Sequence, residues 1–151
     1  MELNTKMIKI NLSNTKKVEA LFKEYGDKAV DAFEDVIFDE ATKMAEVAKL
    51  KSPVDNGTLR NSINWEKENN LLYNVGTNIP YAPFMEFGTG GLVDIPNGWE
   101  DMALPFKGKG IKQVNISPQP FMYPAYLEGK KTFKKQMKLV IDKLSNKFNN
   151  G

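Results

Sequence analysis

The segment VGTNIPYAPFMEFGTG, residues 75–90, brings prolines, aromatic residues and glycines together in a short span. Pro83 suits the first turn of a helix, where its missing N–H costs nothing, and Gly88 is well placed to end that helix. We therefore predict a helix of about two turns over residues 81–87. A turn, a short helix and a second turn would make this segment a rigid unit that shapes the core.

The residues before this segment have the pattern of antiparallel strands. Residues 62–68 and 71–77 form a predicted hairpin around Asn69-Asn70, because asparagine tolerates the left-handed backbone of a tight turn. Residues 7–12, MIKINL, alternate apolar and polar side chains and predict another short strand. The sheet is therefore expected to consist of a hairpin plus edge strands.

Two helices are predicted on either side of these strands. Apolar residues recur at three- and four-residue intervals over residues 15–50, which indicates one long amphipathic helix that ends before Pro53. Gly26 is a point where this helix can bend or stop. A second apolar stripe predicts a C-terminal helix over residues 122–148. The expected fold is α+β, a small antiparallel sheet packed against both helices in a single domain of residues 1–151.

Residues 88–117 have no sustained period and are rich in Gly, Lys and Pro, which predicts a long flexible loop. Two of its aromatic residues have no evident place in the core. Apolar side chains on such a loop indicate a surface that a partner covers. The candidate subunit interface therefore consists of Trp99, Phe106, Lys107 and Lys109.

The composition removes several classes of function. The chain has no cysteine and no histidine, which excludes disulfides, thiolate nucleophiles, Ser-His-Asp triads and zinc sites built on Cys or His. Its 21 basic and 19 acidic residues are too evenly matched for an ordinary nucleic-acid-binding protein. No apolar run approaches the roughly 20 residues of a membrane span, and the N-terminus lacks a signal peptide's apolar core. We expect synthesis in the cytoplasm, with no membrane partner.

Two other functions stay open. The carboxylates could supply an acid/base pair for a small hydrolase, although their spacing favours caps and solvated loop charges; they are Asp55, Glu86, Asp94, Glu100 and Asp101. The basic segment of Lys107, Lys109 and Lys112 could bind DNA or a protein partner, although it also suits a solvated loop. The glycines at 88–91 match no phosphate-binding motif.

Arg60 is the only arginine among the basic residues. A guanidinium can hold a carboxylate with two hydrogen bonds, which lysine cannot reproduce. One hypothesis is that Arg60 pairs with Glu86 or Asp55 and so connects two glycine-containing motifs. The other is that it is an exposed arginine of little consequence.

Three stretches in order, PVDNGTLRNSI (53–63), VGTNIPYAPFMEFGTG (75–90) and PQPFMYPAY (118–126), resemble the tail-component family of long-tailed bacteriophages and prophages. These are small neck, head–tail connector or tail completion proteins typified by HK-type siphophages. The departure is the connection between the second and third motifs, which is longer here than is usual in that family. The motif residues expected to have structural roles are Asp55, Gly57, Leu59, Arg60, Ser62, Gly76, Tyr81, Pro83, Glu86, Phe87, Gly88, Pro120 and Phe121.

The resemblance implies a structural virion protein without catalytic residues, cofactor, metal site or small-molecule substrate. Many copies would form a ring at the head–tail junction or at the end of the tail. The implied partners are other copies of the chain and neighbouring head-closure, tail-terminator or tail-tube proteins, with weak contact to passing DNA. A ring of identical subunits needs two different complementary surfaces on each subunit.

Overall fold

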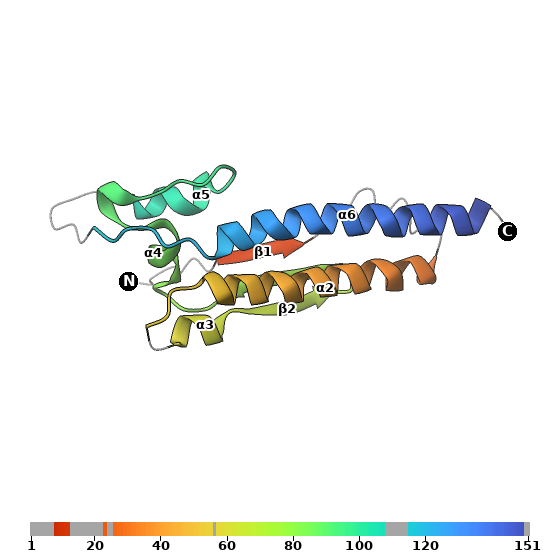
Figure 1. The fold of residues 1–151 in the computed structure, drawn as a ribbon, viewed down its shortest axis with the longest axis horizontal. Coiled ribbons are helices and arrows are strands. Elements are labelled where there is room, and N and C mark those ends of the chain that lie inside the picture. The colour runs from red at the N-terminus through yellow and green to blue at the C-terminus, as the bar shows by residue number, and fades with distance from the viewer. Residues whose placement is uncertain (1–7, 13–22, 24–25, 56, 108–114, 150–151) are drawn as a thin grey trace.

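The structure is a computed structural model that describes residues 8–12, 23, 26–55, 57–107 and 115–149 (Figure 1). In that part of the chain, three strands and the helices α2 to α6 form an elongated molecule. No helix in the described ranges has the length and apolar character needed to cross a membrane. The α+β fold class predicted from the sequence is confirmed.

The sheet has three strands in the order β1-β3-β2, and both pairs are antiparallel. Strands β2 (Asn64–Asn69) and β3 (Leu72–Thr77) form the predicted hairpin, and β1 (Ile8–Leu12) pairs with the other edge of β3. The Oδ1 atom of Asn69 accepts the backbone N–H of Leu71 at 3.0 Å. This side-chain hydrogen bond supports the turn, as expected for asparagine at that position.

Helix α2 (Asp27–Lys51) begins directly after Gly26, whose φ of 67° lies in the left-handed region. A non-glycine residue rarely adopts this conformation, so the glycine ends the helical path that the apolar spacing extended back to residue 15. The predicted long helix is therefore confirmed from residue 27 onward. Of residues 15–25, only Lys23 is among the described residues.

Helix α6 (Met122–Asn149) confirms the predicted C-terminal helix and packs along α2 (Figure 1). The two helices are antiparallel, because Lys51 pairs with Glu128 at one end while Phe33 packs with Met137 further along. A Cβ atom on Gly129 would lie 2.3 Å from Met44 Cε. The missing side chain at Gly129 therefore lets Met44 of α2 fit closely against α6.

Short helices surround the end of the molecule at which α6 begins (Figure 1). The predicted two-turn helix is α4 (Ala82–Phe87), with Pro83 in its first turn and Gly88 at its C-terminus. Helix α3 (Thr58–Ser62) precedes the hairpin. The segment predicted as a loop over residues 88–117 contains three short helices: η1 (Gly90–Leu92), α5 (Glu100–Ala103) and η2 (Leu104–Phe106).

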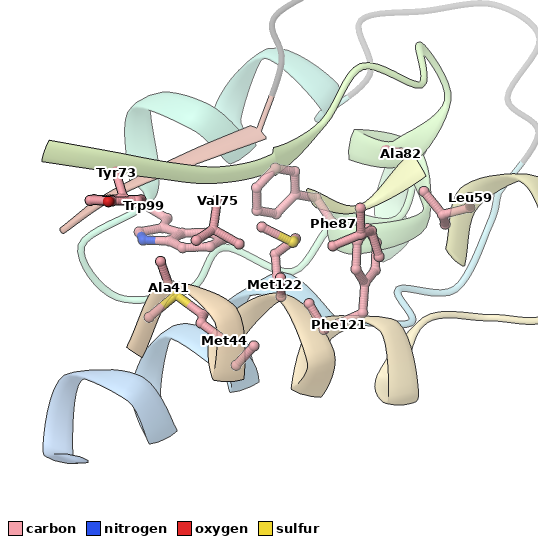
Figure 2. Close-up of a cluster of buried hydrophobic side chains, with 14 of the residues drawn as sticks. Ala41, Met44, Leu59, Tyr73, Val75, Ala82, Phe87, Trp99, Phe121 and Met122 are labelled. Carbon is pink, nitrogen blue, oxygen red and sulfur yellow. The ribbon is translucent and has the colours of Figure 1, made fainter. Parts of the chain in front are cut away.

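The core joins α2, the sheet and the start of α6 to these short helices (Figure 2). Trp99 is only 7% exposed, and its ring contacts Phe87 at 6.2 Å and Tyr123 at 5.1 Å between centroids. Phe106 is half-buried and stacks 5.9 Å from Phe87. Trp99 therefore packs within its own chain and Phe106 does so in part, while the role of either residue in a subunit interface stays a prediction.

Candidate functional site

Glu86 connects the second and third motifs. Its side chain is 1% exposed, and its carboxylate accepts three backbone N–H groups at the start of α6. Oε2 accepts from Phe121 and Met122, and Oε1 accepts from Tyr123, each at 2.8 Å. These donors have no acceptor within the helix, and a negative charge at a helix N-terminus is favourable. Glu86 is therefore the N-terminal cap of α6, supplied from a distant part of the chain.

The charge state of Glu86 depends on two opposing influences. Burial raises the pKa of its carboxyl above the ordinary value, while the three backbone N–H groups oppose that rise. A raised pKa in a buried carboxyl is one sign of catalysis. Here, however, both oxygens are already occupied by the backbone of α6. The arrangement is suited to holding a helix in place.

A second connection closes the base of the long segment between these motifs. Thr89 donates its backbone N–H to the Ile116 carbonyl at 3.0 Å and accepts the Ile116 N–H on Oγ1 at 2.8 Å. Gln119 donates its N–H to the Met85 carbonyl at 2.7 Å. Gly88 lies against this connection with φ of 76°, and a Cβ there would come within 2.7 Å of the Ile116 carbonyl oxygen. Only glycine fits both the backbone angle and the space.

The first motif meets the second at an apolar groove of about 560 Å³. Tyr81 and Phe84 of the second motif are 43% and 40% exposed and form part of its wall. Val54, which is exposed, lies in sequence between two of the lining residues, Pro53 and Asp55. The residues that line the groove are Pro53, Asp55, Gly57, Leu59, Tyr81, Phe84, Met85, Thr89 and Ile116.

Within the first motif, the glycine rather than the aspartate sets the turn. Gly57 precedes α3 with φ of 79°, and no side chain caps the helix there. Ser62 Oγ and Thr77 Oγ1 lie 2.6 Å apart, which ties the end of α3 to the end of β3. Leu59 is buried in the core. The motif therefore positions one wall of the groove.

Arg60 does not make the ion pair that the sequence suggested. Its Nη2 donates to the backbone carbonyl of Ser52 at 3.3 Å, and its buried Nε has no hydrogen-bond partner in the described part of the chain. Glu86 is instead occupied by the start of α6. Arg60 thus fastens the end of α2 to α3, and the hydrogen bonds of Glu86 join the second motif to the third rather than to the first.

The other candidate chemistry does not assemble into a site. Among the described residues, no group of three or more acidic side chains is placed to hold a metal ion. Asp55 and Asp94 are exposed, and Glu100 accepts the Gly98 N–H at 3.0 Å, which lowers its pKa. Lys107 is exposed, while Lys109 and Lys112 lie outside the described residues, so DNA contact by that segment stays a prediction.

Sequence reasoning singled out Glu86 and Gly88 but missed their partners. The acceptor groups of Ile116 and the donor groups of Phe121 belong to the backbone, and backbone groups leave no mark in a sequence. The available signal was the order of the motifs. The structure also places the other motif residues. Pro120 is exposed and directly precedes Phe121, which is fully buried. Gly76 of β3 pairs with Asn64 of β2 in the sheet.

Residues 16–88 match the model of a family described as Bacteriophage HK97-gp10, putative tail-component. The match includes the first motif and most of the second, and it ends at Gly88, two residues after Glu86. It confirms the resemblance predicted from the sequence. None of the curated proteins and none of the solved structures compared with the chain matches it significantly.

Proposed function

We propose that this chain, whose residues 16–88 belong to the HK97-gp10 tail-component family, is a structural protein of the neck or tail end of a phage particle. Copies of the chain form a ring at the head–tail junction or at the end of the tail. The observation that carries the proposal is Glu86, because the most buried motif carboxylate is used entirely to hold α6.

Other motif residues also have structural roles. Gly88 allows a close backbone approach, Ser62 joins α3 to the sheet, and Phe121 fills the core. A catalytic site would instead leave a polar group with a perturbed pKa facing a cavity. The groove at Tyr81 and Phe84 is mainly apolar, which suits contact with a protein surface. We therefore infer a role in assembly rather than in catalysis.

The groove is the surface that we assign to a neighbouring virion protein. Its exposed aromatic side chains, Tyr81 and Phe84, belong to residue types that are enriched at protein interfaces. Both come from α4 and its N-cap, which Pro83 and Gly88 hold rigidly. A head-closure, tail-terminator or tail-tube protein is the partner class expected for a chain of this family.

The ring is tested by light scattering coupled to size-exclusion chromatography over a concentration series, with negative-stain images of any large species. Closed rings of one size are expected. A chain that stays monomeric at every concentration would contradict spontaneous ring formation.

The place in the particle needs a separate test. A phage or prophage carrying Tyr81→Ala and Phe84→Ala is expected to produce heads and tails that fail to join or tails that end irregularly, visible by electron microscopy. Leu104→Ala changes an exposed apolar residue that does not line the groove and is the matched control. Normal particles from the groove variant would contradict the assigned surface.

A further inference from the structure

The outward face of α2 carries a row of aspartates. They recur at every fourth position, so they lie on one side of the helix, and all are exposed. The buried positions of the same helix, such as Phe33 and Ile37, face the core instead. We call this row the acidic stripe; it consists of Asp27, Asp31, Asp35 and Asp39.

Helix α6 carries the opposite charge. It contains seven lysines and only two carboxylates, Glu128 and Asp142, and no carboxylate lies between these two. Lysines spaced one turn apart again share one side of the helix, and they are exposed. We call this group the basic stripe; it consists of Lys130, Lys131, Lys134, Lys135 and Lys138.

Neither stripe is neutralised within the described part of the chain. The ion pairs there join Lys43 to Glu40, Lys51 to Glu128 and Lys67 to Glu34, none of which is a stripe residue. Lys130 does lie over the Tyr126 ring, at 5.5 Å from its centroid. Like charges four residues apart on a helix repel each other and destabilise the helix. Both helices therefore carry a local electrostatic cost that a complementary surface would offset.

The two stripes overlap along the length of the molecule. Because α2 and α6 are antiparallel, Phe33 at the middle of the acidic stripe packs near Met137, close to the end of the basic stripe (Figure 1). Met44, beyond the acidic stripe, faces Gly129, just before the basic stripe. A rotation about an axis roughly parallel to the helices would therefore bring one stripe to the other without a large shift along that axis.

We propose that the acidic stripe on α2 of one copy packs against the basic stripe on α6 of the next copy. The inference rests on the ring proposed above and adds the two surfaces that a head-to-tail contact requires. Leu127 and Leu139 of α6 and Phe38 of α2 are exposed beside the charged residues and supply apolar area. Complementary charge sets the register of the contact and its specificity.

A second copy explains more of the surface than DNA would. A DNA backbone would use only the lysines and would leave the aspartates of α2 without a role. A copy of the same chain uses both stripes, which occupy comparable lengths of neighbouring helices. The charges of the described surface therefore favour contact between identical subunits.

The test exchanges the charges. Variant A carries Asp31→Lys and Asp35→Lys, and variant B carries Lys134→Glu and Lys138→Glu. Each variant alone places like charges at every contact, so each is expected to shift from the mass of the oligomer to that of the monomer. An equimolar mixture of A and B, and a single chain with all four changes, are both expected to regain oligomers. Mass is measured by sedimentation velocity at low ionic strength.

Several outcomes separate the possibilities. Lys147→Glu reverses an exposed charge outside the basic stripe and should leave assembly unchanged. Circular dichroism and thermal melting check that every variant is folded.

Oligomers that persist in A and B, or a mixture that fails to regain them, would overturn the stripe contact while leaving the ring intact. Loss of duplex DNA binding in B, with assembly unchanged, would assign the lysines to DNA. A wild-type chain that never self-associates would overturn the ring and this contact together.

Discussion

The carboxylate of Glu86 accepts the backbone N–H of Met122 at 2.8 Å, 36 positions further along the chain. This hydrogen bond joins the end of α4 to the start of α6, and so connects the second motif to the third. The donors would otherwise be buried without acceptors, since Phe121 and Met122 are fully buried. One side chain thus supplies the acceptor for the first backbone donors of a helix that forms one side of the molecule.

Replacing Glu86 is expected to be among the most damaging single changes. Glu86→Ala should lower the free energy of unfolding by about 3 kcal/mol, because it leaves buried N–H groups without a charged acceptor. Urea denaturation at pH 7, followed by circular dichroism, measures this loss. The matched control is Glu128→Ala, which removes an exposed carboxylate from the same end of α6 and should change stability by less than about 1 kcal/mol. Similar losses in both variants would show that Glu86 has no special role.

Three glycines allow backbone strain to be separated from crowding. Gly88→Ala meets both a positive φ and the Ile116 carbonyl oxygen at 2.7 Å, so it should destabilise the chain by about 3 kcal/mol. Gly98→Ala meets only the positive φ and should cost about 1 kcal/mol. Gly91→Ala meets neither and should be nearly neutral. Thermal melting of the three variants should give this order; equal effects would contradict the close approach at Gly88.

Glu40 gives a prediction about pH. Its side chain is 1% exposed, and burial raises its pKa above the ordinary value of 4.5, although Lys43 Nζ, 3.6 Å from its Oε1, opposes this rise. The folded state therefore binds a proton more readily than the unfolded state does. The stability that this group contributes is present below pH 4.5 and is lost as the pH rises through its folded-state pKa.

Glu40→Gln removes this titration. The quantity compared is the melting temperature of the variant minus that of the wild type, and this difference is expected to be larger at pH 7.5 than at pH 4.5. At pH 7.5, about three units above the ordinary pKa, only the wild type carries the buried charge. Glu46→Gln, on the exposed face of the same helix, is the control and should show little change between the two pH values. A pH-independent difference for Glu40→Gln would contradict the raised pKa.

Replacing Trp99 tests whether it is a core residue or an interface residue. Trp99→Ala should lower the free energy of unfolding by about 3–5 kcal/mol, because it empties a site between Phe87 and Tyr123. Leu104→Ala, at an exposed position in the same segment, should cost less than about 1 kcal/mol. Chemical denaturation of the isolated chain provides the comparison. A folded Trp99→Ala variant that has unchanged stability and fails only in assembly would indicate that Trp99 belongs to a subunit interface.

The sequence predicted the regular elements well because their signals are local. The spacing of apolar residues located α6, and the alternation around Asn69 located the hairpin. Pro83 and Gly88 defined α4 to within a residue. In each case a residue type and its near neighbours determine the backbone, and no distant partner is needed.

The connections between elements were less predictable, because they depend on distant backbone groups. The ionic reading of Arg60 and Glu86 was chemically reasonable, but three N–H groups at a helix start compete successfully for the same carboxylate. The composition of the segment after Gly88 predicts a loop. Its order comes from the burial of Trp99 and Phe106 against residues that lie far away in sequence.

Thr89 and Ile116 face each other across two hydrogen bonds although they are 27 positions apart. The stretch between them therefore begins and ends at one point of the protein, and between these ends Trp99 packs back into the core. Residues gained or lost within such a stretch need not move the elements on either side. Because its base is closed in this way, the stretch is a place where extra residues, such as a tag, could be introduced with little effect on the elements on either side.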